Sequence, residues 1–265
     1  MLLSFYQSSW RYRHFILSSI RSEFVNRFLR SKLGGLWVII HPLTQVLIYA
    51  LILSAVLAAK LPGIDNRFAY AIYLCAGILG WGLFNEIVSR GLTIFIDNGN
   101  LLRKISFPRI TLPLIMLGAA LINHLLLLLA ILVVFLILGH APGITLLWLP
   151  ILSLLTAALA LGTGLILGVF NVFVRDVGQV VTIVLQMLFW FTPIVYPISI
   201  VPDALRDWLV FSPVFPLISG FQNILVYNKP PELLPLVFVG ALAALVLAFA
   251  LLLFRRATPD ILEQL

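Results

Sequence analysis

The longest uncharged block of this chain limits its fold more than any other feature. Between Ile110 and Val174, 65 residues pass without an Asp, Glu, Lys or Arg. A membrane-spanning helix needs about 20 largely apolar residues, so one straight helix of this length would exceed the bilayer about threefold. A turn signal, His-Ala-Pro-Gly at residues 140–143, stands near the middle. The block therefore predicts two membrane spans joined by a short connection.

The overall composition leads to the same fold class. Of the 265 residues, 62% are hydrophobic and 10% are charged, and the mean hydropathy is +1.12, whereas a soluble domain carries about a quarter charged residues. A membrane β-barrel would alternate apolar and polar residues, and continuous runs such as Leu125–Leu138 do not alternate. The predicted fold class is an all-α integral membrane protein, with residues 1–265 forming a single transmembrane domain.

Six spans are predicted from the apolar runs. They are Leu36–Ala58, Phe68–Val88, Leu112–Gly139, Ile144–Phe170, Val177–Tyr196 and Leu233–Phe254, so that residues 36–196 hold the first five spans and residues 233–254 the sixth. Residues 208–228 are also uncharged and could form a seventh span. Pro213 and Pro216 interrupt that run and would break its hydrogen-bond ladder. We therefore expect residues 197–232 to form a re-entrant or interfacial hairpin.

The orientation follows from the basic residues. With the N-terminus inside, thirteen of the 17 Lys and Arg residues lie on the inner side and four on the outer side, so both termini, including the tail 255–265, are predicted to be cytoplasmic. In a membrane chain, a net charge of +7 indicates cytoplasmic loops rather than a nucleic-acid surface. The N-terminal residues have no apolar core of signal-peptide length, and we expect them to stay in the mature protein.

Residues 1–34 have a pattern of their own. Aromatic and aliphatic residues recur there at helical spacing between basic residues, and Trp10, Arg13, Phe24 and Arg27 are representative. This pattern predicts a helix that lies on the cytoplasmic membrane surface. The alternative is a positively charged tail without a further role.

The residues needed for catalysis or metal binding do not come together in the sequence. The chain has a single cysteine, Cys75; its ten acids never stand side by side, and its four histidines lack metal-binding spacing. No lysine follows a glycine, as a phosphate-binding loop would require. We therefore predict no catalytic, metal or cofactor site on this chain, and any ATP hydrolysis would need a separate ATP-binding subunit.

Polar and aromatic residues inside the spans are the candidates for function. Polar side chains are costly in a bilayer, and Glu86 is either a contact for a transported molecule or an acid that reaches back to the interface. For Asn123 and His124, hydrogen bonding between helices is the favoured interpretation. Some aromatic residues could line a conduit, while others pack in the core. The candidate channel residues are Tyr49, Phe84, Glu86, Trp190 and Tyr196.

The loop after the second span is a candidate docking element. Residues 97–100, Asp-Asn-Gly-Asn, are a strong turn signal, and Asn100 can cap a short helix over Leu101–Ile105 that Pro108 ends. This helix would present apolar and basic side chains to a partner. The residues predicted to dock are Asn98, Asn100, Leu101, Leu102, Arg103 and Lys104.

Four segments resemble a known family. They are residues 31–42 (SKLGGLWVIIHP), 98–109 (NGNLLRKISFPR), 171–177 (NVFVRDV) and 192–197 (TPIVYP). In order and spacing they are similar to the permease subunits of ABC-2 type polysaccharide exporters, in particular the group that exports lipopolysaccharide O-antigen. The residues Phe211-Ser-Pro213 depart from the Asn-Pro that many relatives have at this turn.

The resemblance implies a homodimer in the bacterial inner membrane, paired with two ATP-binding cassette subunits. Residues 100–105 would be the coupling helix, the N-terminal helix a second contact, and residues 197–232 short periplasmic gate helices. The cargo would be an undecaprenyl-linked O-antigen, with capsular polysaccharide or teichoic acid as alternatives. An intramembrane enzyme acting on a polyprenyl lipid, and a passive channel, are the rival classes.

Overall fold

The computed structural model describes residues 12–29, 69–99, 109–137, 139–202 and 211–264, together with residues 36–37, 39–40, 43–44, 101, 206 and 209. All regular structure in these residues is helical, which confirms the all-α class for the described part of the chain. Four helices are long and apolar enough to cross a membrane. They are α4 (Ala69–Asp97), α6 (Thr111–Ile137), α7 (Leu149–Phe173), which follows the 3₁₀ turn η2 (Ile144–Trp148), and α11 (Leu233–Gln264).

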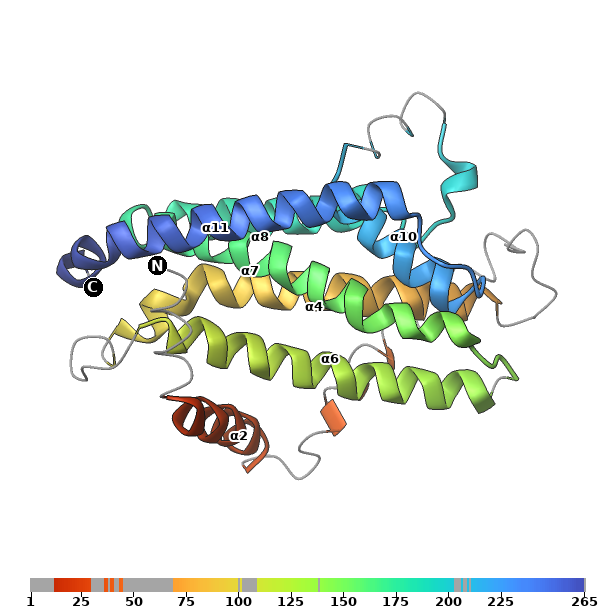
Figure 1. Ribbon diagram of the computed structural model, residues 1–265, viewed down its shortest axis with the longest axis horizontal. Helices are drawn as coiled ribbons and strands as arrows, with labels where there is room; N and C mark the ends of the chain where they lie inside the picture. The colour runs from red at the N-terminus through yellow and green to blue at the C-terminus, as the bar shows by residue number, and fades with distance from the viewer. Residues whose placement is uncertain are drawn as a thin grey trace.

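These four helices lie side by side along the long axis of the molecule (Figure 1). The helix α2 (Arg13–Leu29) lies outside them against α6. Two shorter apolar helices complete the described helices, α8 (Asp176–Phe191) and α10 (Val214–Leu225). Together with the 3₁₀ turn η3 (Ile198–Ile200), α10 lies at the end of the bundle opposite the C-terminus (Figure 1).

Helix α4 forms the centre of the bundle. Most of its side chains are buried, and it contacts α6, α7, α8 and α10. Its closest neighbour is α7, because glycines face each other where the two helices meet. A Cβ atom built on Gly91 would lie 2.9 Å from the backbone of Gly164. Small residues allow two backbones to touch in this way, and van der Waals contact then supplies much of the attraction between membrane helices.

The two-span interpretation of residues 110–174 is confirmed. Helix α6 ends at Ile137, Gly139 takes a left-handed φ of 73°, and the chain returns through η2 into α7. The connection also holds the end of α10. His140 Nε2 lies 2.7 Å from the carbonyl oxygen of Leu225, and the backbone N–H of Gly143 donates to Asn228 Oδ1 at 2.7 Å.

The predicted number of spans is matched only in part. The second, third, fourth and sixth spans correspond to the four long helices. The fifth corresponds to α8, whose 16 residues extend about 24 Å, short of a hydrocarbon core of about 30 Å. The first span, Leu36–Ala58, lies outside the described residues except for a few isolated positions. Six spans therefore remain a prediction.

Two helices extend beyond the spans that the sequence predicts. Helix α4 continues nine residues past Val88 to Asp97, and α11 continues past Phe254 to Gln264 through Pro259. Hydropathy ended both spans where charged residues begin, but an α-helix does not need an apolar sequence to continue. Ala257 and Ile261 remain buried, so the predicted tail 255–265 begins as a packed extension of the last span.

The prolines of residues 208–228 act differently from the prediction. Pro213 is the residue before α10, and Pro216 lies in its first turn, where a missing N–H costs nothing. They therefore start a helix instead of breaking one. With 12 residues and a length of about 18 Å, α10 is too short to span a bilayer, which agrees with a hairpin rather than a seventh span.

Candidate functional site

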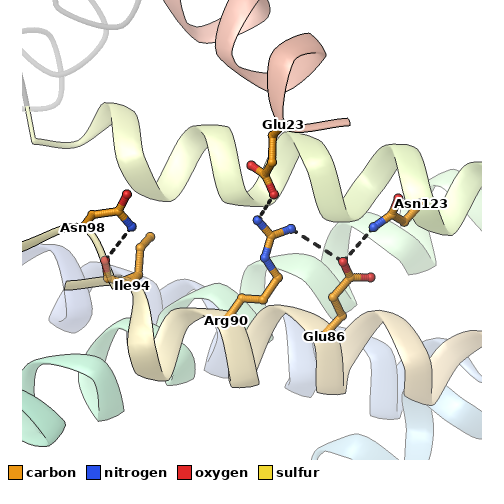
Figure 2. A network of polar contacts seen from close by, with 6 residues as sticks. All are labelled: Glu23, Glu86, Arg90, Ile94, Asn98 and Asn123. Atoms are coloured by element: carbon orange, nitrogen blue, oxygen red, sulfur yellow. Dashed lines mark hydrogen bonds and ion pairs between the residues drawn. The ribbon is translucent and has the colours of Figure 1, made fainter. Parts of the chain in front are cut away.

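A network of polar side chains connects the helices α2, α4 and α6 (Figure 2). Arg90 on α4 forms an ion pair with Glu23 of α2 through Nη2. Its Nη1 lies 3.6 Å from Glu86 Oε1, one turn earlier on α4. The same Glu86 oxygen accepts a hydrogen bond of 2.8 Å from Nδ2 of Asn123 on α6. One arginine thus lies between two carboxylates from different helices.

Local sequence explains how these groups meet. Glu86 and Arg90 are four residues apart and share one face of α4. On α2, Ile20 is buried at 9% exposure and packs over Gly118 of α6, where any side chain would collide with it. Glu23 follows Ile20 by three residues and points to the same side. The close fit of Ile20 on Gly118 therefore brings Glu23 within reach of Arg90.

The network is only partly screened by solvent. The Arg90, Glu23 and Glu86 side chains are 24%, 30% and 28% exposed. Within the described residues, two buried atoms of the network lack a hydrogen bond, Arg90 Nη1 and Asn123 Oδ1. Arg90 therefore attracts both acids, but one of its own nitrogen atoms is left without a hydrogen-bond acceptor. Such an arrangement joins α2 to the spans firmly and leaves polar groups ready to rearrange when α2 moves.

A cleft continues from this network toward the predicted docking loop. It is lined by Glu23 and Arg90 at one end and by Asp97 and Asn98 at the other, with Met116 of α6 as part of its wall. Asn98 Nδ2 donates to the Ile94 carbonyl at 2.8 Å and so closes the last turn of α4 (Figure 2). The surface helix, the ion pairs and the start of the loop therefore lie along one cleft.

The other predicted docking residues are described only in part. The backbone N–H of Leu101 donates to the Asn98 carbonyl at 3.0 Å, and the Leu101 side chain packs against the core. The remaining four, Asn100, Leu102, Arg103 and Lys104, lie outside the described residues, so the coupling helix stays a prediction.

The N-terminal helix is confirmed over Arg13–Leu29. Its Arg13 is exposed at the first turn, Trp10 lies outside the described residues, and the side chains of Phe24 and Arg27 are not described. Leu17 is 62% exposed, although Ile20 one turn later is buried. Contact of α2 with the lipid surface remains a prediction.

Two of the candidate channel residues, Phe84 and Trp190, are connected through the rings of Trp81 and Phe189. The Trp81 and Phe189 centroids are 5.7 Å apart, and those of Phe189 and Trp190 are 5.4 Å apart. Phe84 is buried, with its ring centroid 5.9 Å from that of Trp81. Trp190 is half exposed on α8, and the Tyr196 hydroxyl donates to the Trp190 carbonyl at 2.8 Å, which closes the end of that helix. Glu86 belongs to the polar network, and Tyr49 lies outside the described residues.

Two further polar contacts connect helices in the core. His124 on α6 hydrogen-bonds to the Ser153 hydroxyl on α7 at 2.9 Å. With the Asn123–Glu86 contact, this confirms the prediction of interhelical bonding for the pair Asn123 and His124. Asn171 near the end of α7 donates to the Leu92 carbonyl of α4 at 2.9 Å. In the sequence Asn171 stands out only as part of the segment 171–177. An amide side chain near the end of an apolar span was the one sign that it could bond to another helix. Within the described residues, no three His, Cys, Asp or Glu side chains lie together as a metal would need.

These features define a multi-span α-helical membrane protein whose helix α2 is joined to its long helices by an ion pair. The sequence profile described as ABC-2 type transporter matches residues 15–226. The chain therefore belongs to the ABC-2 type transporter family.

Several curated proteins are similar to this chain. The O-antigen export system permease protein RfbA of Myxococcus xanthus is 27% identical over 258 residues, covering 97% of both chains. The protein of the same name from Klebsiella pneumoniae is 27% identical over 202 residues, covering 75% of this chain and 74% of its own length. The polysialic acid transport protein KpsM of Escherichia coli is 22% identical over 247 residues, covering 91% and 93%.

Proposed function

We propose that this chain is the membrane-spanning permease subunit of an ATP-driven exporter that moves a lipid-linked polysaccharide across the bacterial inner membrane. The single observation that carries the proposal is the match along 97% of the chain to a permease named for O-antigen export. The four long apolar helices suit such a subunit. The cargo is an undecaprenyl-linked O-antigen. Capsular polysaccharide is the second candidate, favoured by the similarity to a polysialic acid transport protein.

The exporter is a homodimer of this chain with two ATP-binding cassette subunits that supply ATP hydrolysis. Its N- and C-termini are cytoplasmic, as the distribution of basic residues predicts. In this orientation the network of Glu23, Arg90 and Glu86 lies at the cytoplasmic half of the bundle, beside the predicted docking loop. When the ATP-binding subunit displaces α2 or the loop, the movement is therefore transmitted to α4 and α6 through the Arg90 ion pairs.

Deletion of this chain from its host tests the proposal. We expect the surface to lose one polysaccharide while its lipid-linked form accumulates inside the cell, and we expect a plasmid copy to restore export. Lipopolysaccharide on gels shows loss of O-antigen, and staining of the cell surface shows loss of capsule, so the assay also separates the two cargoes. A deletion strain with unchanged surface polysaccharides would contradict the proposed function.

A further inference from the structure

A pocket at the end of the bundle opposite the C-terminus has a lining that none of the assignments above uses. It lies where the start of α4, the loop 192–197, η3 and α10 meet. Its aromatic and proline walls come from Tyr73, Phe215, Tyr227, Pro193 and Pro197, and its polar groups come from Ser199, Ser219, Gln222 and Asn223.

One face of α10 supplies much of this lining. Phe215, Ser219 and Asn223 recur at intervals of four residues and therefore form one stripe along the helix. Tyr227 follows four residues after Asn223, just beyond the end of α10, and also lines the pocket. The stripe thus presents an aromatic ring at each end with a hydroxyl and an amide between them.

The opposite wall is held firmly by hydrogen bonds. The Tyr73 hydroxyl donates to the carbonyls of Pro193, at 2.9 Å, and Tyr196, at 3.1 Å. Gln222 Nε2 donates to the Pro193 carbonyl at 3.0 Å, and the Tyr70 hydroxyl donates to Val195. The loop that faces the stripe is therefore fixed before any ligand arrives, which lowers the entropic cost of binding.

The remaining polar groups of the pocket are available. Among the described residues, the side chains of Ser199, Ser219 and Asn223 form no hydrogen bond with another protein group. None of the described lining residues carries a charge. Burial raises the pKa of the Tyr227 phenol, so the phenol also stays neutral. The described lining therefore offers no cation to a phosphate or a carboxylate; the guanidinium of Arg206, which donates to the carbonyls of Ile198 and Val201, lies beside the pocket but does not line it.

We propose that this pocket binds a neutral sugar residue of a glycan chain, an inference that rests on the proposed function for its choice of ligand. A pyranose ring presents C–H groups on its faces and hydroxyl groups around its edge. Aromatic and proline rings cover the faces, while hydroxyl and amide groups pair with the edge. Ser219 and Asn223 pair with sugar hydroxyls, and the partly exposed Phe215 and Tyr227 rings contact the sugar faces. With the termini in the cytoplasm, the pocket lies at the outer end of the bundle, where an exported chain would emerge.

A cysteine-protection assay on the full-length protein tests this inference. The chain has one cysteine, Cys75, which is buried, so an introduced exposed thiol is labelled selectively. Ser199 lines the pocket, whereas the adjacent Ile200 is 60% exposed and does not, so Ser199→Cys and Ile200→Cys form a matched pair. Labelling rates with a hydrophilic maleimide are measured with maltotetraose, mannotetraose, chitotetraose or glucose 6-phosphate present.

We expect at least one neutral tetrasaccharide to slow labelling of Ser199→Cys by about threefold or more, and glucose 6-phosphate to have no effect. Ile200→Cys should label at the same rate throughout. Adding Asn223→Ala to Ser199→Cys should raise the sugar concentration that gives half protection by about three- to tenfold, which corresponds to the loss of one neutral hydrogen bond. Equal protection at both positions, or protection only by the sugar phosphate, would overturn the inference.

A second arm uses the host's own glycan and separates the two proposals. The Ser199→Cys protein is labelled in spheroplasts whose glycan synthesis is switched on or off. Slower labelling with synthesis on identifies the exported chain as the ligand, whereas protection only by added sugars identifies free oligosaccharide. If surface glycan depends on this chain but neither arm gives protection, the pocket inference fails alone. If surface glycan does not depend on this chain, the proposed function fails.

Discussion

Replacing Arg90 by methionine should loosen the connection between α2 and the spans by an amount that the structure allows us to bound. The change keeps an unbranched side chain of similar length and removes only the charge. Exposed ion pairs contribute about 0.2–1 kcal/mol, whereas removing one partner of a fully buried pair costs about 3–5 kcal/mol. Arg90 is 24% exposed and serves two acids. We therefore expect Arg90→Met to cost about 1–3 kcal/mol of unfolding free energy.

The two ion pairs should differ in strength. Nη2 of Arg90 forms a direct hydrogen bond to Glu23, whereas Nη1 lies 3.6 Å from Glu86, beyond hydrogen-bond distance. Double-mutant cycles that combine Arg90→Met with Glu23→Gln or Glu86→Gln measure each pair separately. We expect about 1 kcal/mol for Glu23 with Arg90, and about 0.3–0.5 kcal/mol for Glu86, as for other pairs one turn apart on a helix.

The buried thiol of Cys75 in α4 provides the assay. A thiol-reactive fluorescent dye reports when α4 becomes accessible on heating, and about 2–4 °C per kcal/mol gives a lower midpoint by about 2–12 °C for Arg90→Met. Arg256→Met is the control, because Arg256 is exposed on α11 and belongs to none of the described ion pairs. An unchanged midpoint, together with a Glu23 coupling below about 0.3 kcal/mol, would refute the reasoning.

Three further predictions test the packing, the orientation and the docking loop. Gly164→Ala should lower the unfolding midpoint, because its Cβ would lie 3.1 Å from the Ile87 carbonyl oxygen. Gly82→Ala is the control, since a Cβ there would have no atom within 4 Å, and it should leave the midpoint unchanged or raise it. Equal effects of the two changes in the same dye assay would contradict the close contact of α4 and α7. A cysteine at position 142 (Pro142→Cys) should react with an impermeant thiol reagent in intact spheroplasts. Gln264→Cys should react only after the spheroplasts are lysed, and its reaction from outside would reverse the proposed orientation of the C-terminus. Leu102→Asp should abolish co-purification with the ATP-binding subunit and stop export, since small interfaces depend on a few apolar anchors. Wild-type yield of the complex would exclude Leu102 as an anchor.

Long uncharged runs predicted the fold class well, because hydropathy over about 20 residues is a strong physical constraint. Together with the turn signal at residues 140–143, hydropathy predicted the helices on either side of that turn correctly. Helix ends were harder to predict. The predicted second span ends at Val88, just before Arg90, whereas α4 continues to Asp97 as a helix in which Arg90 pairs with Glu23 of α2.

The candidate site was predicted residue by residue but not as a unit. Glu86 and Asn123 were singled out because polar groups are costly in a bilayer, and the structure joins them. The sequence contains no sign that Glu23 would meet Arg90, because this contact depends on the fit of Ile20 over Gly118. An aromatic side chain alone predicted its position less well, since Phe84 is buried and Trp190 is half exposed.

The glycine contact between α4 and α7 restricts how the subunit can change shape. If α4 slid along α7 by one turn, about 5.4 Å, Ile87 or Phe95 would take the place of Gly91 opposite Gly164. Neither side chain fits between two touching backbones. The two helices must therefore travel as one rigid body during any cycle of opening and closing. Elements that contact the pair of helices only through side chains can still change position. One of them is α2, which is joined to α4 by the ion pair of Glu23 with Arg90.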